Sequence, residues 1–156
     1  MKFLIPIGCA LACLALGFLS GFSTFESIEG WYSTLKKPSF NPPNWIFGPV
    51  WSVLYLAMGI AVGLIANLGL SHPGVKLALT LFAIQMLFNV IWTPVFFGMH
   101  QILAALVIIV LLWTAILICM IKFFKLRRLS GWLLVPYLLW VSFATVLNAS
   151  LWILNA

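Results

Sequence analysis

Residues 77–121 read LALTLFAIQMLFNVIWTPVFFGMHQILAALVIIVLLWTAILICMI, a run of 45 residues without Asp, Glu, Lys or Arg. The apolar core of a bilayer takes roughly 20 helical residues, so this run is long enough for two membrane spans. A short hairpin at Gly98-Met99-His100 divides it. The sequence therefore predicts spans at about 75–97 and 101–123.

The uncharged stretches on either side extend the same pattern. Charged residues make up 6% of the 156 residues and hydrophobic residues 65%, whereas a soluble domain usually carries about a quarter charged residues. The run that follows Lys2 resembles a signal peptide, but it is much longer than the usual apolar region of about 7–15 residues. We therefore expect one all-α integral membrane domain, a bundle of five transmembrane helices, with the other three spans at about 3–25, 45–70 and 131–154.

The net charge of +6 comes from residues that flank the expected spans. With five spans, six Lys and Arg residues share the side of the N-terminus. The opposite side holds two lysines, offset by Glu26 and Glu29. For a protein inserted in a bacterial cell membrane, the positive-inside rule predicts a cytoplasmic N-terminus and the 26–44 loop outside. The same rule explains the basic charge without nucleic acid. The six are Lys2, Lys76, Lys122, Lys125, Arg127 and Arg128, the last four in an expected 122–130 loop.

The 26–44 loop is the most distinctive connection. It contains Trp31-Tyr32, Lys36-Lys37-Pro38 and Asn41-Pro42-Pro43-Asn44. Proline fixes its own φ and restrains the residue before it, so we expect a stiff segment. A connection of this length between helices is often functional.

Amide side chains within the spans are costly in lipid and indicate either packing or function. Gln85, Asn89 and Thr93 are spaced at i, i+4 and i+8, so they share one helical face. For Gln85 an interhelical hydrogen bond is the favoured interpretation. For Asn89, together with Trp92, we expect a cavity.

Of the eight tryptophans, Trp31 lies in the 26–44 loop and the other seven fall into two groups. Those at the ends of spans are explained by the aromatic belt of membrane proteins. Trp51, Trp92, Trp113 and Trp140 lie deeper. Deep indole rings near a few amides and hydroxyls suit a flat, aromatic, largely apolar ligand; for Trp113, packing or lipid contact is the favoured interpretation.

Several chemistries are disfavoured by what the spans lack. Apart from Lys76 and Lys122 at their very ends, the spans contain no Asp, Glu, Lys or Arg, which argues against an ion-coupled pump. His72 and His100 fall in connections, and the three cysteines fall in apolar runs without neighbouring ligands, so we expect no metal and no cofactor. The pairs Gly17/Gly21 and Gly59/Gly63 match a close-packing motif, which leaves packing within the chain and dimerisation both open.

Taken together, these segments resemble the TspO/translocator protein family, also called the peripheral-type benzodiazepine receptor family. The resemblance covers four of the five spans and the long loop, in the family's order. It is carried by Trp31-Tyr32, Lys37-Pro38-Ser39-Phe40-Asn41-Pro42-Pro43, Gly48-Pro49-Val50-Trp51, Phe88-Asn89, Trp92-Thr93-Pro94-Val95-Phe96-Phe97-Gly98, Val135-Pro136-Tyr137-Leu138-Leu139-Trp140 and Phe143-Ala144-Thr145-Val146-Leu147-Asn148.

The resemblance implies a five-helix bundle, often a homodimer, with a ligand cavity capped by the first long loop. The family's ligands are porphyrins and haem, sterols and benzodiazepine-like compounds. Light-dependent porphyrin breakdown has been proposed for the family, and its positions match Trp51 and Trp140. The positions that match the family's pocket are Trp31, Tyr32, Pro42, Trp51, Asn89, Trp92, Trp140, Ala144 and Leu147.

One stretch departs from the family's animal members. Their sterol motif on the fifth helix needs a Tyr and then a basic residue, whereas residues 148–153 here read NASLWI. Even a complete motif of this kind is weak. The absence of this motif argues against specific cholesterol recognition, but not against a general apolar cavity that takes sterol-like or benzodiazepine-like ligands.

The sequence leaves three candidate functions open. The first is binding of a porphyrin-like molecule for sensing, sequestration or transport. The second is an enzyme that degrades the porphyrin with light and oxygen. The third is a regulatory partner protein that docks through Lys125, Arg127 and Arg128, although these residues are more simply determinants of topology.

Overall fold

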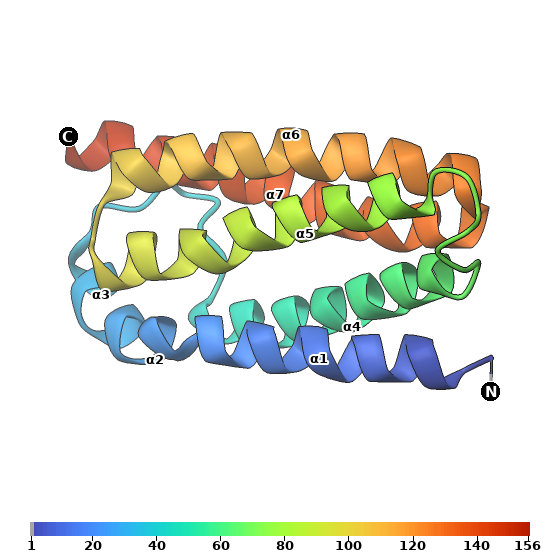
Figure 1. The fold of residues 1–156 in the computed structure, drawn as a ribbon. Helices are drawn as coiled ribbons and strands as arrows, with labels where there is room; N and C mark the ends of the chain where they lie inside the picture. The colour runs from blue at the N-terminus through green and yellow to red at the C-terminus, as the bar shows by residue number, and fades with distance from the viewer. Residues whose placement is uncertain (1) are drawn as a thin grey trace.

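The chain is a bundle of long, nearly parallel or antiparallel helices (Figure 1). The structure is a computed structural model, and it describes residues 2–156. In these residues every regular element is a helix. The elements are α1 (Leu4–Ser20), α2 (Phe22–Glu29), α3 (Trp31–Thr34), η1 (Asn44–Ile46), α4 (Phe47–Ala66), α5 (Val75–Thr93), η2 (Pro94–Gly98), α6 (Ile102–Leu126) and α7 (Arg128–Asn155).

Five helical segments are long and apolar enough to cross a membrane. α1 and α2 form one of them, because Gly21 between them keeps a helical φ and ψ and its N–H bonds to Gly17. The prediction of an all-α membrane bundle with five spans is confirmed. The five segments are Leu4–Glu29, Asn44–Ala66, Val75–Gly98, Ile102–Leu126 and Arg128–Asn155.

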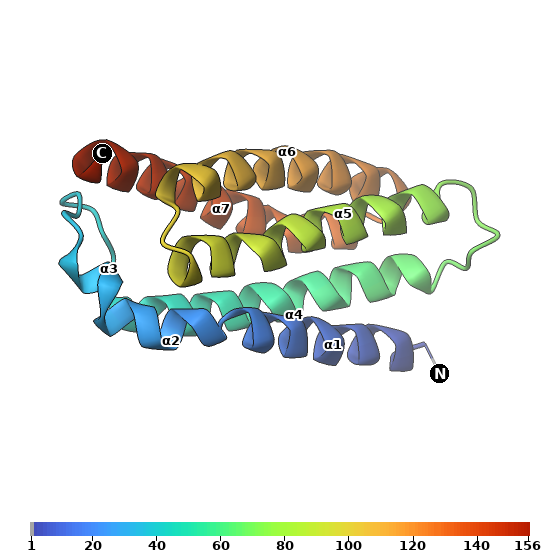
Figure 2. The same ribbon diagram turned by 60° about the vertical axis from the view of Figure 1, so that its left-hand side comes forward.

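The spans form a closed ring rather than following the order of the chain. α1 packs against α4, α4 against α7, α7 against α6, and α6 against α5. α1 also contacts α5, and α2 contacts η2, which closes the ring. In Figures 1 and 2, α1 and α4 accordingly lie side by side, with α6 and α7 on the other side of the bundle.

The contact between α1 and α4 depends on small residues. A Cβ added to Gly59 would overlap the backbone of Ala10, and one added to Gly63 would overlap the backbone of Pro6. The glycines therefore let the two backbones approach closely, as small residues commonly do in membrane helices. The Gly59/Gly63 pair thus serves packing within the chain.

The connection between α6 and α7 is shorter than expected, and the connection between α4 and α5 is longer. α6 continues to Leu126 and α7 begins at Arg128, so most of the expected 122–130 loop is helical. Basic side chains are favourable in the last turn of a helix, which explains how α6 continues past Lys122. α4 ends at Ala66, before the expected 70, and a turn-rich connection with Gly69 and Gly74 at positive φ follows.

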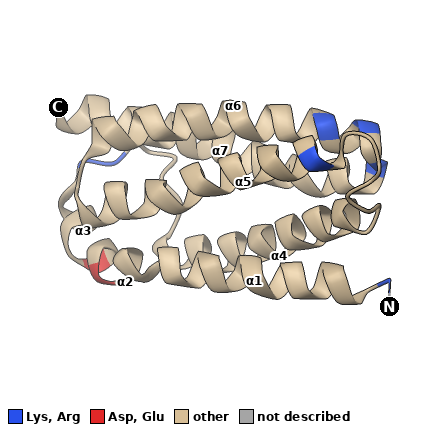
Figure 3. Ribbon diagram, in the orientation of Figure 1, with Lys and Arg blue, Asp and Glu red and all other residues tan. Residues whose placement is uncertain are grey.

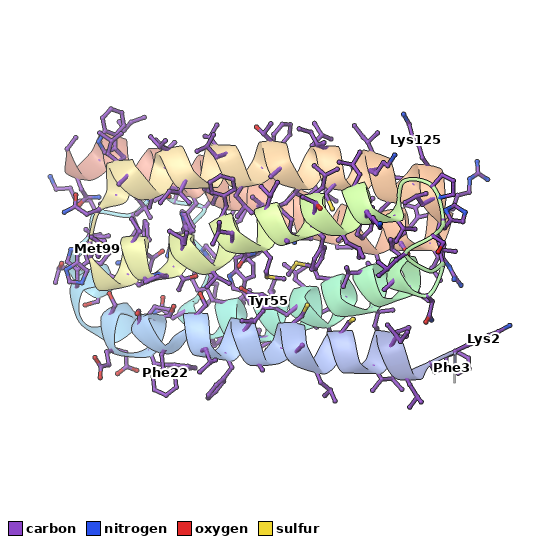
Figure 4. All side chains as sticks on the ribbon, viewed as in Figure 1. Lys2, Phe3, Phe22, Tyr55, Met99 and Lys125 are labelled. Carbon is purple, nitrogen blue, oxygen red and sulfur yellow. The ribbon has the colours of Figure 1, made fainter. Side chains whose placement is uncertain are left out.

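The charges gather at the two ends of the bundle (Figure 3). Most Lys and Arg residues lie at the end with the N-terminus, and the acidic residues lie on α2 at the opposite end. In Figure 4, Phe3 and Phe22 project outward from the bundle, while Tyr55 lies among the side chains between the helices. Exposed apolar side chains such as Phe3 suit contact with lipid, because water would not favour them.

Candidate functional site

A cavity of about 530 Å³ lies within the half of the bundle that carries α2 and α3. This is within the range of about 300–1,000 Å³ that is usual for small-molecule sites. Asp, Glu, Lys, Arg and His are all missing from its lining. The lining residues are Leu14, Gly17, Phe18, Gly21, Thr24, Phe25, Ile28, Tyr32, Asn44, Trp45, Phe47, Gly48, Trp51, Ser52, Tyr55, Trp92, Thr93, Phe96, Phe97, Trp140, Phe143, Ala144, Leu147, Asn148 and Leu151.

Four tryptophans line this cavity; Trp45 lies on η1, and the other three come from three different long helices. Trp51 comes from α4, Trp92 from α5 and Trp140 from α7. The Trp92 ring stacks on Phe96 with 5.2 Å between ring centroids, and the Trp140 ring lies 5.5 Å from Phe143. The walls are therefore broad aromatic faces, which suit a flat ligand.

The indole N–H groups of these rings differ in their partners. Trp92 Nε1 donates to Asn148 Oδ1 at 3.2 Å, and Asn148 Nδ2 donates to the carbonyl of Ile102 at 3.0 Å. Trp140 Nε1 is buried and has no partner among residues 2–156. The Trp140 ring is thus held by packing alone, whereas the Trp92 ring is also held by a hydrogen bond to α7.

A buried hydrogen-bond network connects α4, α5 and α7. The Tyr55 hydroxyl donates to Asn89 Oδ1, and Asn89 Nδ2 donates to the Tyr137 hydroxyl at 2.5 Å. The Tyr137 hydroxyl donates in turn to Gln85 Oε1 at 2.8 Å. Of these four residues only Tyr55 lines the cavity. Asn89 was expected in the cavity, but it supports the wall through Tyr55, and Gln85 makes the expected interhelical bond.

Aromatic contacts and a hydrogen bond hold Tyr32 at the loop end of the cavity. Its side chain is 1% exposed, and its hydroxyl donates to Asn41 Oδ1 at 2.7 Å. Burial raises the pKa of Tyr32 to about 12, so the hydroxyl stays protonated and able to donate at neutral pH. Lys37 Nζ lies 4.9 Å from the centroid of the same ring. Tyr32 is therefore a fixed part of the lining.

The segment of residues 35–43, which we call the strap, joins α3 to η1. It rises from α3 to the C-terminal end of α7 (Figure 2). The backbone of Lys36 makes two hydrogen bonds to the Asn155 side chain, and the Phe40 ring lies 6.2 Å from Phe143. The strap is thus fastened to α7, which supplies much of the cavity wall.

The structure brings six of the nine expected pocket residues to the cavity and leaves three outside its lining. Trp31 stacks on His100, with 4.3 Å between ring centroids, and so joins α3 to the hairpin after η2. Pro42 lies in the strap, and Asn89 lies in the network. The six on the lining are Tyr32, Trp51, Trp92, Trp140, Ala144 and Leu147.

Several lining residues were not anticipated. α1 and α2 contribute a whole side of the cavity, including Gly17 and Phe18, although this span has no amide and no tryptophan to mark it. The Phe96-Phe97 pair belongs to a recognisable motif and could have been included from it. Among residues 2–156 no three His, Cys, Asp or Glu residues come together as metal ligands would.

Comparison with known proteins agrees with this architecture. The model of the TspO/MBR family matches residues 9–153. The "Tryptophan-rich protein TspO" of Chlorobaculum tepidum is 44% identical over 147 residues, which cover 94% of this chain and 93% of that protein. The "Tryptophan-rich sensory protein" of Cereibacter sphaeroides is 42% identical over 77% of this chain and 73% of its own length. The human "Translocator protein" is 39% identical over 88% of this chain and 83% of its own length.

Proposed function

Because the chain belongs to the TspO/MBR family, we propose that it binds a porphyrin-like molecule in the cavity and senses, sequesters or transports it. The observation that carries the proposal is the meeting of Trp51, Trp92 and Trp140 around one uncharged cavity. Similar proteins are named for sensing and for translocation, which supports the same group of roles.

The polarity of the cavity favours a flat, mostly apolar guest. Most of the lining is aromatic or aliphatic, and Asn148 uses both ends of its amide within the protein. A fully enclosed charge would therefore lose its hydration without gaining a partner. Acidic groups on such a ligand fit best at the loop end, next to Tyr32, because the ammonium group of Lys37 lies over the Tyr32 ring, although Lys37 itself is outside the lining.

Titration of the purified protein with protoporphyrin, followed by porphyrin absorbance, tests this site. Trp51→Ala and Trp140→Ala should each weaken binding about tenfold, because each removes a large aromatic contact. The matched control is Trp132→Ala, which removes an indole that is 63% exposed and outside the lining. Equal affinity in all four proteins would contradict the site.

The same purified proteins, mixed with protoporphyrin, also distinguish a binding protein from an enzyme that degrades the porphyrin. Trp51 and Trp140, the two positions that a degrading enzyme would use, lie on the same cavity. Under illumination, a defined product formed many times per protein would favour the enzyme. Loss of about one porphyrin per protein, without further turnover, would favour binding alone.

The proposal also includes the kind of membrane and the orientation of the protein in it. We place the protein in a bacterial cell membrane with the N-terminus in the cytoplasm and α3 and the strap outside, because the basic residues gather at the N-terminal end (Figure 3). A reporter fused to the N-terminus that read external would contradict this orientation.

A homodimer is also proposed. Gly59 and Gly63 already pack against α1, so the interface has to use other lipid-facing surface. Cross-linking in native membranes tests it, and recovery of monomer only would contradict it.

A further inference from the structure

Asn155, in the last turn of α7, is the residue that fastens the strap to the bundle. Its Oδ1 accepts the N–H of Lys36 at 2.9 Å, and its Nδ2 donates to the carbonyl of Lys36 at 2.9 Å. Nδ2 also donates to the carbonyl of Leu151 at 2.8 Å, which fixes the amide on its own helix. One side chain thus satisfies both backbone groups of a residue far away in the chain.

The strap connects two parts of the cavity wall. Tyr32 lies just before it on α3, and Asn44, Trp45 and Phe47 follow it on η1 and α4; all four line the cavity. At its midpoint Phe40 packs against Phe143, which lines the cavity from α7. The position of the strap therefore determines how the loop end of the cavity is closed.

We propose that Asn155 is a positioning residue that holds the strap against α7 and so sets how long a ligand stays in the cavity. The proposal rests on the function proposed above, since it concerns the same site. Asn155 itself lies outside the lining. Its effect is therefore on the rate of ligand release rather than on the contacts that the ligand makes.

The first measurement needs no ligand. In Asn155→Ala the Lys36 N–H loses its acceptor, so hydrogen exchange at Lys36 and across residues 35–43 should rise about tenfold. The matched control is Asn67→Ala, because the Asn67 side chain also bonds to a distant backbone group, the Lys2 carbonyl at 2.6 Å. That bond lies at the opposite end of the bundle, so exchange in the strap should stay unchanged.

The second measurement is the rate at which protoporphyrin leaves each protein after rapid mixing with an apolar acceptor such as lipid vesicles. Asn155→Ala should speed release about tenfold, and Asn67→Ala should not change it. Unchanged exchange in Asn155→Ala would overturn the fastening role. Raised exchange with unchanged release would overturn the role in residence time. If even the unaltered protein fails to bind protoporphyrin, the proposed function fails, while the exchange result still decides whether Asn155 fastens the strap.

Discussion

α1 and α4 are in close backbone contact at one end of the bundle and line a cavity at the other. Toward the basic end, Gly59 and Gly63 bring the backbone of α4 against that of α1. Toward the loop end, α4 carries Trp51 and Tyr55, and the two helices line a cavity. The difference teaches that residue size helps to decide where the helices pack closely and where a cavity remains: glycines allow close contact, whereas bulky aromatic side chains keep the helices apart.

The largest expected effect on stability comes from disrupting the close contact between α1 and α4 at Gly59. Gly59→Leu places a side chain where the backbone of Ala10 lies, and a backbone cannot move aside without separating the helices. We expect a loss of about 3 kcal/mol in the free energy of unfolding, or a fall of about 10 °C in Tm. The control is Gly8→Leu on α1, since a Cβ there meets no atom within 4 Å. Thermal unfolding in detergent measures both, and equal Tm values would contradict the close contact.

The second largest effect on stability is expected from the buried hydrogen-bond network that connects α4, α5 and α7. Asn89→Ala leaves the buried Tyr55 hydroxyl without its acceptor and should cost about 2 kcal/mol of stability. In that background Tyr55→Phe should cost much less than it does in the unaltered protein, because the bond is already lost. Chemical or thermal unfolding of the four proteins measures the coupling. Strictly additive losses would show that the two side chains do not stabilise each other.

The smallest effect on stability, with a clear effect on binding, comes from filling the hollow end. Ala144→Phe adds a ring at the cavity wall and should weaken protoporphyrin binding at least about tenfold. The free energy of unfolding should change by less than about 1 kcal/mol, since the ring enters empty space. Ala104→Phe, on an exposed position of α6 outside the lining, is the control. A loss of stability as large as that of Gly59→Leu would remove the contrast between the two ends.

Much of the fold could be predicted because lipid imposes simple rules. A run of about 20 uncharged apolar residues has few alternatives to a membrane helix, so 77–121 predicts two spans directly. Charge, however, marks the border of the membrane and not the end of a helix. Lys122 and Lys125 therefore stay helical, although they were expected in a loop.

The site could be predicted in part because some residues are conspicuous in lipid. Trp51, Trp92 and Trp140 stand out by their depth, and all three line the cavity. The hydrogen-bond partner of a polar residue cannot be predicted from the sequence in the same way. Asn89 looks equally suited to a ligand and to a neighbouring helix, and only the arrangement of Tyr55 and Tyr137 decides between them.

The ring order of the helices has a consequence for biosynthesis. α1 and α4 leave the ribosome before α5 and α6, and α7, which packs against α4 and completes the wall, follows these four helices. A chain that has inserted only its first four spans has Trp51 and Trp92 in place but lacks Trp140 and the rest of the α7 wall. The compartment is therefore assembled from helices that are synthesised far apart in time, and it closes only after α7 has joined the other four spans.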